Sequence, residues 1–301
     1  MSTSPLFDDL LEDLTSSLVL SPDLPDETMK TTLEALWHAA AGNPCSATRA
    51  SQRELEELQD DQISTLRALV GRRLSGIPLM QLTGRVNFMD TELLFEPPTF
   101  LVRQETEILG NCAVDLLTNR IVEKEHPCMI DVCCGSGNLS CGIARKLPKL
   151  RVHAVDILES GVALTTRNVR NCSLMDRVSV LKGDLFEPLK QCGITRSVDL
   201  VVCNPPYISS VRLKSDRSYL LDHEPREAFD GGVYGFSMHQ RLIKESPEFL
   251  KPGGWLLFEF GAGQRKQVQT LFERSKAYDL LEFVPDCQGI DRVGIGRRRP
   301  E

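Results

Sequence analysis

The stretch that decides the fold is Val198–Tyr207, V-D-L-V-V-C-N-P-P-Y. Its apolar run, residues 200–203, is typical of a buried strand and stops at the tetrapeptide N-P-P-Y. Two consecutive prolines have no backbone N–H and fix their own φ, so neither strand nor helix continues through them. In an open α/β sheet, ligands bind at the carboxyl ends of the strands. An Asn, two prolines and an aromatic ring there could clamp a flat nitrogen-bearing group; a plain turn after a core strand is the alternative.

Composition and charge describe an ordinary globular protein of 301 residues, 41% hydrophobic and 26% charged. No apolar run approaches the roughly 18–20 residues of a membrane helix, and the acidic N-terminal segment lacks the basic start of a secretory signal. The net charge of −7 counts against direct binding of nucleic acid. The ten cysteines show no metal-binding spacing, so we expect free, mostly buried thiols in a cytoplasmic protein without a metal site.

Residues 1–85 are expected to form a helical N-terminal domain, because apolar residues recur there at helical spacing. The region holds 13 Asp/Glu against 7 Lys/Arg. That excess fits either a solvated helical face or a substrate-docking surface for a basic partner. Residues 86–100 follow with alternating apolar positions that predict a β-hairpin linker.

Residues 101–301 alternate strands and helices, which predicts an α/β domain with a parallel sheet covered on both faces. A helix is expected to begin at Thr106 and Glu107. Strands are expected at residues 129–132, 152–155, 178–181, 200–203 and 255–260, and further helices at 139–146, 162–169, 238–250 and 264–274. Residues 251–254 predict a turn, and an antiparallel pair at 280–284 and 293–296 would close the sheet.

The spacing Asp131-x-x-x-Gly135-x-Gly137 after the first strand predicts a nucleotide-binding turn. Glycines let the backbone approach a ligand closely, and the N-terminus of the next helix faces it. Asp156 ends the second strand about 20 residues later, where an acidic residue can bond a ribose diol. This arrangement suits NAD as well as S-adenosylmethionine.

Three features favour S-adenosylmethionine over NAD. Cys133 and Asn138 depart from a clean G-x-G-x-x-G pattern. Asp184 follows the third strand, where a carboxylate can accept a hydrogen bond from an adenine amino group. The N-P-P-Y tetrapeptide follows the fourth strand, where a dehydrogenase has no use for it. No G-K-[ST] follows the glycines, which excludes a P-loop, and the histidines fit surface or structural positions better than catalytic ones.

Taken together, the motifs of residues 66–299 resemble those of the HemK/PrmC protein-glutamine methyltransferases. The resemblance is carried by R-R-L-S-G-I-P-L-M-Q-L-T-G, V-R-Q-E-T-E, D-V-C-C-G-S-G, A-V-D, G-D-L-F-E-P-L, C-N-P-P-Y-I, E-P-R-E-A-F-D-G-G and L-K-P-G-G-W-L-L-F-E. It implies a seven-stranded, Rossmann-like class I methyltransferase domain joined by a β-hairpin to a small helical domain. It also implies an enzyme that methylates the glutamine of the Gly-Gly-Gln motif in peptide chain release factors, with S-adenosylmethionine as cofactor.

The resemblance also implies roles for individual residues. Those expected to hold the cofactor are Asp131, Cys133, Cys134, Gly135, Ser136, Gly137, Asp156, Asp184, Leu185 and Asn204. Those expected to bind the substrate are Arg103, Glu105, Asn204, Pro205, Pro206 and Tyr207, of which the last four are also the expected catalytic residues. In this reading Asn204 and the Pro205 carbonyl accept hydrogen bonds from the substrate amide, and Tyr207 packs on its plane.

Two departures from the family pattern leave alternatives open. Gln104 stands where the family usually has Pro, and Cys133 replaces the first glycine of the turn. Both would suit a diverged enzyme acting on a small-molecule amine or amide. Methylation of adenine in nucleic acid and a non-enzymatic binding protein are further alternatives; the acidic balance disfavours the first, and the intact N-P-P-Y disfavours the second.

Overall fold

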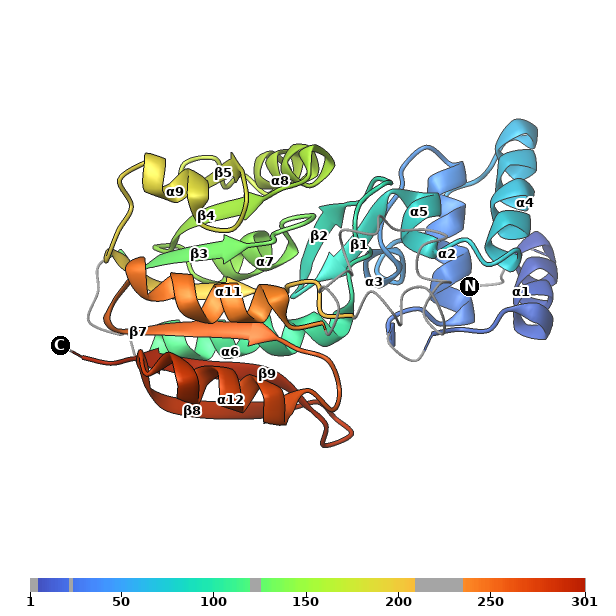
Figure 1. Ribbon diagram of the computed structural model, residues 1–301. Helices are drawn as coiled ribbons and strands as arrows, with labels where there is room; N and C mark the ends of the chain where they lie inside the picture. Colours follow the sequence, from blue (N-terminus) through green and yellow to red (C-terminus); the bar gives the residue numbers. More distant parts are fainter. Residues whose placement is uncertain (1–4, 22–23, 120–125, 209–234, 301) are drawn as a thin grey trace. The chain divides into compact units, whose positions relative to one another are not determined.

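The computed structural model describes residues 5–21, 24–119, 126–208 and 235–300. The chain divides into two compact units, Met1–Glu96 and Pro97–Glu301. The first is helical, and the second is built on a large sheet (Figure 1). The E-P-R-E-A-F-D-G-G motif, residues 224–232, lies outside the described residues.

The first unit is a small helical domain with an apolar core of its own. Its elements are α1 (Pro5–Ser17), α2 (Met29–Ala40), α3 (Ala47–Ala50), α4 (Asp60–Leu74), α5 (Leu79–Thr83), β1 (Arg85–Phe88) and β2 (Thr91–Leu94). Leu14, Leu33, Leu36 and Leu66 are buried completely. These residues follow the helical spacing of the sequence, so each helix buries one apolar stripe against its neighbours. The predicted β-hairpin is β1 paired with β2 in antiparallel register.

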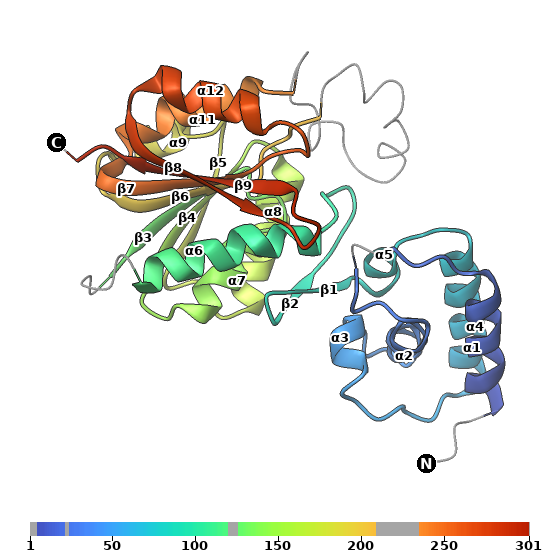
Figure 2. The ribbon, with the colours of Figure 1, turned by 90° about the horizontal axis from the view of Figure 1, so that it is seen from below.

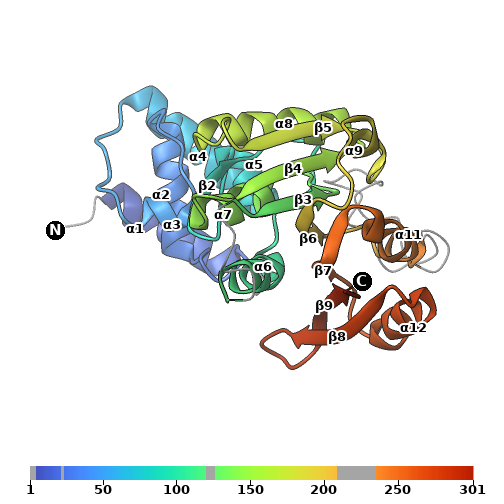
Figure 3. The ribbon, with the colours of Figure 1, turned by 90° about the vertical axis from the view of Figure 1, so that its left-hand side faces the viewer.

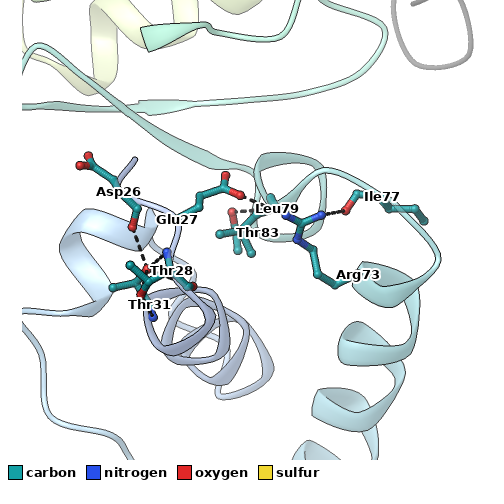
Figure 4. A network of polar contacts seen from close by, with 8 residues as sticks. All are labelled: Asp26, Glu27, Thr28, Thr31, Arg73, Ile77, Leu79 and Thr83. Atoms are coloured by element: carbon teal, nitrogen blue, oxygen red, sulfur yellow. Dashed lines mark hydrogen bonds and ion pairs between the residues drawn. The ribbon is translucent and has the colours of Figure 1, made fainter. Parts of the chain in front are cut away.

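Polar contacts fix the start of α2 and join it to the end of α4 (Figure 4). Thr28 and Thr31 form a capping box, in which each side chain accepts a hydrogen bond from the other's backbone N–H. Arg73 lies 3.2 Å from Glu27 and also donates to the Ile77 carbonyl. Burial raises the pKa of Glu27. The ion pair therefore stabilises this unit only while both partners are present, because either one alone would be a buried, uncompensated charge.

The second unit is a three-layer α/β domain. Its strands are β3 (Cys128–Val132), β4 (Arg151–Asp156), β5 (Val178–Lys182), β6 (Val198–Cys203), β7 (Leu250–Glu259), β8 (Tyr278–Pro285) and β9 (Asp291–Arg298). Its helices are η1 (Gln104–Thr106), α6 (Glu107–Asn119), α7 (Asn138–Lys146), α8 (Glu159–Asn171), α9 (Glu187–Gln191), α11 (Ser237–Glu245), η4 (Ser246–Glu248) and α12 (Arg265–Ser275). Helices α6, α7 and α8 cover one face of the sheet, and α9, α11 and α12 cover the other (Figures 2 and 3).

The seven strands are ordered β5-β4-β3-β6-β7-β9-β8. The pairs from β5 to β7 are parallel, whereas β9 pairs antiparallel with both β7 and β8. The predicted seven-stranded α/β fold with a closing antiparallel pair is confirmed. All six residues of β6 are buried, as expected for a strand with helices on both faces.

The prediction for residues 238–254 was wrong in detail. Helix α11 ends at Glu245, and the expected turn lies inside strand β7. Val198 pairs with Leu250 and Leu200 pairs with Trp255, so four residues of β7 face the single residue Asp199. The bulge contains two glycines, residues 253 and 254. Such a pair is also typical of a turn, because a bulge and a turn both need the backbone freedom of glycine.

No helix among the described residues is long and apolar enough to cross a membrane. Each of the ten cysteines is a free thiol, and only Cys192 and Cys287 are exposed.

Candidate active site

Three of the predicted site segments follow neighbouring strands of the sheet. Val132 of β3 pairs with Val155 of β4 on one side and with Cys203 of β6 on the other. The residues that come next in these parallel strands therefore meet at one edge of the sheet. The sheet thus brings together the glycine turn, the end of β4 and the N-P-P-Y tetrapeptide.

The turn of residues 133–137 has the backbone of a ligand cradle. Gly135 and Gly137 have positive φ angles of 55° and 76°. A Cβ on Gly137 would lie 2.7 Å from Cγ2 of Thr165 in α8, so this position admits only glycine without rearrangement. Cys133 also has a positive φ, 58°. A non-glycine residue there is strained by about 1–2 kcal/mol, and the strain accounts for glycine as the family's usual residue.

Helix α8 holds the turn in place through two side chains. Thr165 Oγ1 donates to the Gly135 carbonyl at 2.9 Å, and Asn168 Nδ2 donates to the Ser136 carbonyl at 2.9 Å. Both side chains are fully buried. The turn is therefore fixed before any ligand arrives, which reduces the entropy lost on binding.

Asp156 ends β4 and anchors the same turn from the other side. Its Oδ2 accepts the Gly135 N–H at 2.7 Å, and its Oδ1 accepts the Leu158 N–H at 2.8 Å. Burial raises the pKa of this carboxyl. Each carboxylate oxygen has two lone pairs, so Asp156 can hold the turn and still accept from a ribose hydroxyl.

Asp131 lies beneath the turn, in β3, and is completely buried. Its Oδ2 accepts from the backbone N–H and the hydroxyl of Ser140, at 3.1 and 2.6 Å. Its Oδ1 has no hydrogen-bond partner among the described residues. Burial raises the pKa of Asp131 to about 7. A buried acceptor left over beside a ligand cradle is what a bound donor group would satisfy.

Asp184 and Leu185 follow β5, beyond Asp156 along the sheet edge. The Asp184 carboxylate accepts from Arg241 Nη1 of α11, at 2.9 Å from each oxygen. Leu185 has a positive φ of 48°, and its side chain packs into the apolar core. An adenine contact by Asp184 would therefore share the carboxylate with Arg241.

The N-P-P-Y tetrapeptide is fixed at both ends by side chains from other elements. Asn204 Nδ2 donates to Thr106 Oγ1 at 3.1 Å, and the Tyr207 hydroxyl donates to Glu259 Oε1 at 3.0 Å. Gln264 Nε2 donates to the Tyr207 carbonyl at 3.0 Å. The buried Pro205 and half-buried Pro206 lie between these anchors.

The acidic segment before α6 lies beside a partly buried arginine. Glu105 Oε2 is 2.9 Å from Arg292 Nη2, and the same nitrogen is 3.9 Å from Glu259 Oε1. Arg103 stacks its guanidinium over the Phe100 ring, 4.9 Å from the centroid. The expected substrate contact by Glu105 would thus come from a carboxylate that is already paired, while Gln104 begins the 3-10 turn η1.

The sequence predicts no functional role for two polar residues of this region. Thr106 is expected to begin a helix, and Glu259 falls within the expected strand of residues 255–260. The available signal was a charged residue closing the apolar run W-L-L-F-E at the same sheet edge. No group of three or more His, Cys, Asp or Glu in the described part of the chain could hold a metal ion.

Comparisons with known proteins agree with the resemblance seen in the sequence. The model of the methyltransferase small domain family matches residues 111–218. The release factor glutamine methyltransferase of Geobacter sulfurreducens is 32% identical over 240 residues, covering 80% of each chain. That of Moorella thermoacetica is 33% identical over 262 residues, 86% of this chain and 89% of that one. A solved methyltransferase from Pyrococcus furiosus, 16% identical, covers 69% of this chain and 88% of its own, with a TM-score of 0.47. The chain belongs to the release factor glutamine methyltransferase family.

Proposed function

We propose that the chain transfers a methyl group from S-adenosylmethionine to the side-chain amide nitrogen of a glutamine, the one in the Gly-Gly-Gln motif of peptide chain release factors. The observation that carries the proposal is the position of Asn204–Tyr207, next to the glycine turn on the neighbouring strand. Relatives named for this activity match across most of the chain.

The cradle fits the cofactor. Gly135 leaves open space where a Cβ would lie, with Phe100 Cβ as the nearest atom at 4.0 Å, and Asp131 Oδ1 is a buried acceptor without a partner among the described residues. In this proposal residues 133–137 hold the methionine part, Asp156 the ribose, and Asp184 with Leu185 the adenine. When bound, the cofactor supplies a methyl group on a positively charged sulfur, which a weak nucleophile can attack.

Orientation is the main contribution of the protein to this reaction. An amide nitrogen is a poor nucleophile because its lone pair is delocalised into the carbonyl group. Asn204 Oδ1 and the Pro205 carbonyl can accept from the two N–H groups of the substrate amide and hold its lone pair towards the methyl group. Fixed acceptors of this kind lower the barrier without a strong base, and Tyr207 would cover one face of the amide plane.

The helical unit is proposed to dock the release factor. It carries most of the chain's net negative charge, which suits a basic partner surface. A cytoplasmic location of the reaction is part of the same proposal, supported by ten free thiols.

A methyl-transfer assay with labelled cofactor tests the proposed acceptor. The substrates are an intact release factor and its variant with Gln→Ala in the Gly-Gly-Gln motif. We expect label on the first and none on the second. Equal labelling of both, or of neither, would remove the release-factor glutamine as substrate.

A further inference from the structure

Glu259 lies beside Asn204 at the carboxyl edge of the sheet. Cys203 pairs with Phe258 in the parallel register of β6 and β7, so the next residues of both strands are neighbours. The Glu259 side chain is only 2% exposed. A carboxylate at that depth is unfavourable unless hydrogen bonds or a counter-charge satisfy it. The groups that donate hydrogen bonds to the Glu259 carboxylate therefore determine its role in the site.

One carboxylate oxygen of Glu259 reaches Asn204 through Thr106. Thr106 Oγ1 donates to Glu259 Oε2 at 2.8 Å and accepts from Asn204 Nδ2 at 3.1 Å. A hydroxyl has one proton, and an ionised carboxylate can only accept. The Thr106 proton must point to Glu259, so Thr106 can only accept from Asn204. This fixes the orientation of the Asn204 amide and leaves Oδ1, its acceptor atom, for a substrate.

The other oxygen of Glu259 holds the opposite end of the tetrapeptide. The Tyr207 hydroxyl donates to Oε1 at 3.0 Å. A single carboxylate thus orients both the first and the last residue of N-P-P-Y. Thr106 is 1% exposed, so water cannot readily replace it in this chain of hydrogen bonds.

The charges around Glu259 leave it incompletely neutralised. Arg292 Nη2 is 3.9 Å from the Glu259 carboxylate but 2.9 Å from Glu105, whose own carboxylate adds negative charge. His239 Nε2 lies 3.0 Å from the backbone oxygen of Glu259 and not from its carboxylate. Burial, together with Glu105, raises the pKa of Glu259 to about 7. The carboxylate is therefore mostly ionised at pH 8, where the arrangement of donors above holds.

We propose that Glu259 is a positioning residue for methyl transfer: acting through Thr106 and the Tyr207 hydroxyl, it holds Asn204 with Oδ1 turned to the acceptor amide. The inference rests on the proposed function, since it assigns Asn204 to the glutamine side of the reaction. It adds a group that touches neither substrate nor cofactor but determines which half of the Asn204 amide the substrate meets.

The test compares two substitutions of Thr106 at pH 8. Thr106→Val removes the hydroxyl and keeps the shape, whereas Thr106→Ser keeps the hydroxyl. We expect Thr106→Val to lower kcat about 10- to 100-fold, the effect of losing an oriented hydrogen bond. Thr106→Ser should stay within about threefold of wild type, and KM and cofactor affinity should change little in both. Equal kcat in Val and Ser variants overturns the proposal. If Thr106→Val does not fold, Thr106→Ala replaces it in the same comparison.

A double-mutant cycle separates the relay from independent structural roles. Glu259→Gln is made in wild type and in Thr106→Val. If Glu259 acts through Thr106, the fall in kcat caused by Glu259→Gln is smaller once Thr106 is Val, and the remaining fall is the part transmitted through the Tyr207 hydroxyl. Additive effects on kcat, or a loss of cofactor affinity in place of kcat, contradict the proposal.

The outcome also separates this inference from the proposed function. A wild-type protein that fails to label the release factor in a glutamine-dependent way removes the proposed function itself. If the wild-type protein labels the release factor normally, but the Thr106→Val and Thr106→Ser variants have equal kcat or the double-mutant cycle is additive, only the proposed role of Glu259 is removed.

Discussion

The Asp156 carboxylate accepts hydrogen bonds from the N–H groups of Gly135 and Leu158. Its proposed contact with the ribose comes in addition to these. Asp156→Ala removes all of these acceptors. We expect the Kd for S-adenosylmethionine to rise about 10- to 100-fold, since hydrogen bonds to a charged group contribute about 1.5–3 kcal/mol. At saturating cofactor kcat should fall much less. Calorimetric titration and steady-state kinetics measure the two effects.

Asp156→Asn is the matched control for that variant. It retains one acceptor oxygen, so its cofactor affinity should fall between wild type and Asp156→Ala. Near-wild-type affinity in Asp156→Ala would count against the ribose contact.

Glu259 makes the stability of the second unit depend on pH. Its pKa is about 7 in the fold, against an ordinary value of 4.5. Between these values the folded protein holds a proton that the unfolded chain releases, so the contribution of Glu259 to stability is lost as pH rises towards 7. Glu259→Gln lacks this dependence. Relative to wild type, the variant should gain up to about 3 kcal/mol between pH 4 and pH 8.

Urea unfolding of wild type and Glu259→Gln at several pH values in that range measures the difference. A constant difference in the free energy of unfolding would show that Glu259 titrates alike in both states. Acidification should therefore raise the contribution of Glu259 to the free energy of unfolding. It should also protonate the carboxylate and so remove the ionised acceptor that orients Asn204.

Single residues differ in how far the sequence could predict them. Asp156 ends a strand, and Gly135 and Asn204 come shortly after one, so local pattern was enough to place all three at one sheet edge. The partnership of Thr106 with Glu259 joins residues 153 positions apart. It depends on how the segment of η1 and α6 packs against β7, which sequence periodicity does not contain.

At the scale of elements, the packing of the glycine turn against α8 distinguishes Gly137 from Gly135. A Cβ on Gly137 would meet Thr165 Cγ2 at 2.7 Å, whereas one on Gly135 would find Phe100 Cβ at 4.0 Å. Both glycines have positive φ. We expect Gly137→Ala to destabilise the fold by about 1–3 kcal/mol more than Gly135→Ala, because the overlap adds to the backbone strain that both share.

Thermal unfolding of the two variants checks this expectation. Thr165→Ser removes Cγ2 but keeps the hydroxyl that binds the Gly135 carbonyl. Combined with Gly137→Ala, it should recover part of the lost stability. Equal melting temperatures for the two alanine variants would be inconsistent with the contact.

Most strand and helix positions in the second unit were predictable because apolar runs and helical spacing alternate clearly there; the short helix α9 was not predicted. The strand at residues 250–254 was not predictable, since Pro252, Gly253 and Gly254 favour a turn locally. Pairing with β6 overrides that preference: Lys251 Nζ lies 3.2 Å from the buried Asp199 carboxylate, which holds the bulge in the strand.

At the scale of the whole molecule, the two units are proposed to divide docking from catalysis. Glu54, Glu57, Asp60 and Asp61 are exposed residues at and before the start of α4. Neutralising all four to Gln or Asn should raise KM for an intact release factor several-fold at low salt, because exposed charges act over about 10 Å at 0.1 M ionic strength. Steady-state kinetics at two salt concentrations measure it.

A short Gly-Gly-Gln peptide is the control substrate for this experiment. It lacks the docking surface, so its KM should be the same for wild type and the neutralised variant. An unchanged KM for the intact factor would instead identify the acidic residues as an ordinary solvated surface.

The most direct test of the account is a paired measurement on Asn204→Ala, of the single-turnover rate of methyl transfer to a release factor and of the Kd for S-adenosylmethionine. With Asn204 on the acceptor side, the rate should fall about 10²- to 10³-fold, as when a fixed hydrogen-bonding group is removed from an active site. The Kd should stay within about threefold of wild type. A collapse of cofactor affinity, or a rate close to wild type, would contradict the assignment of Asn204 to the glutamine amide.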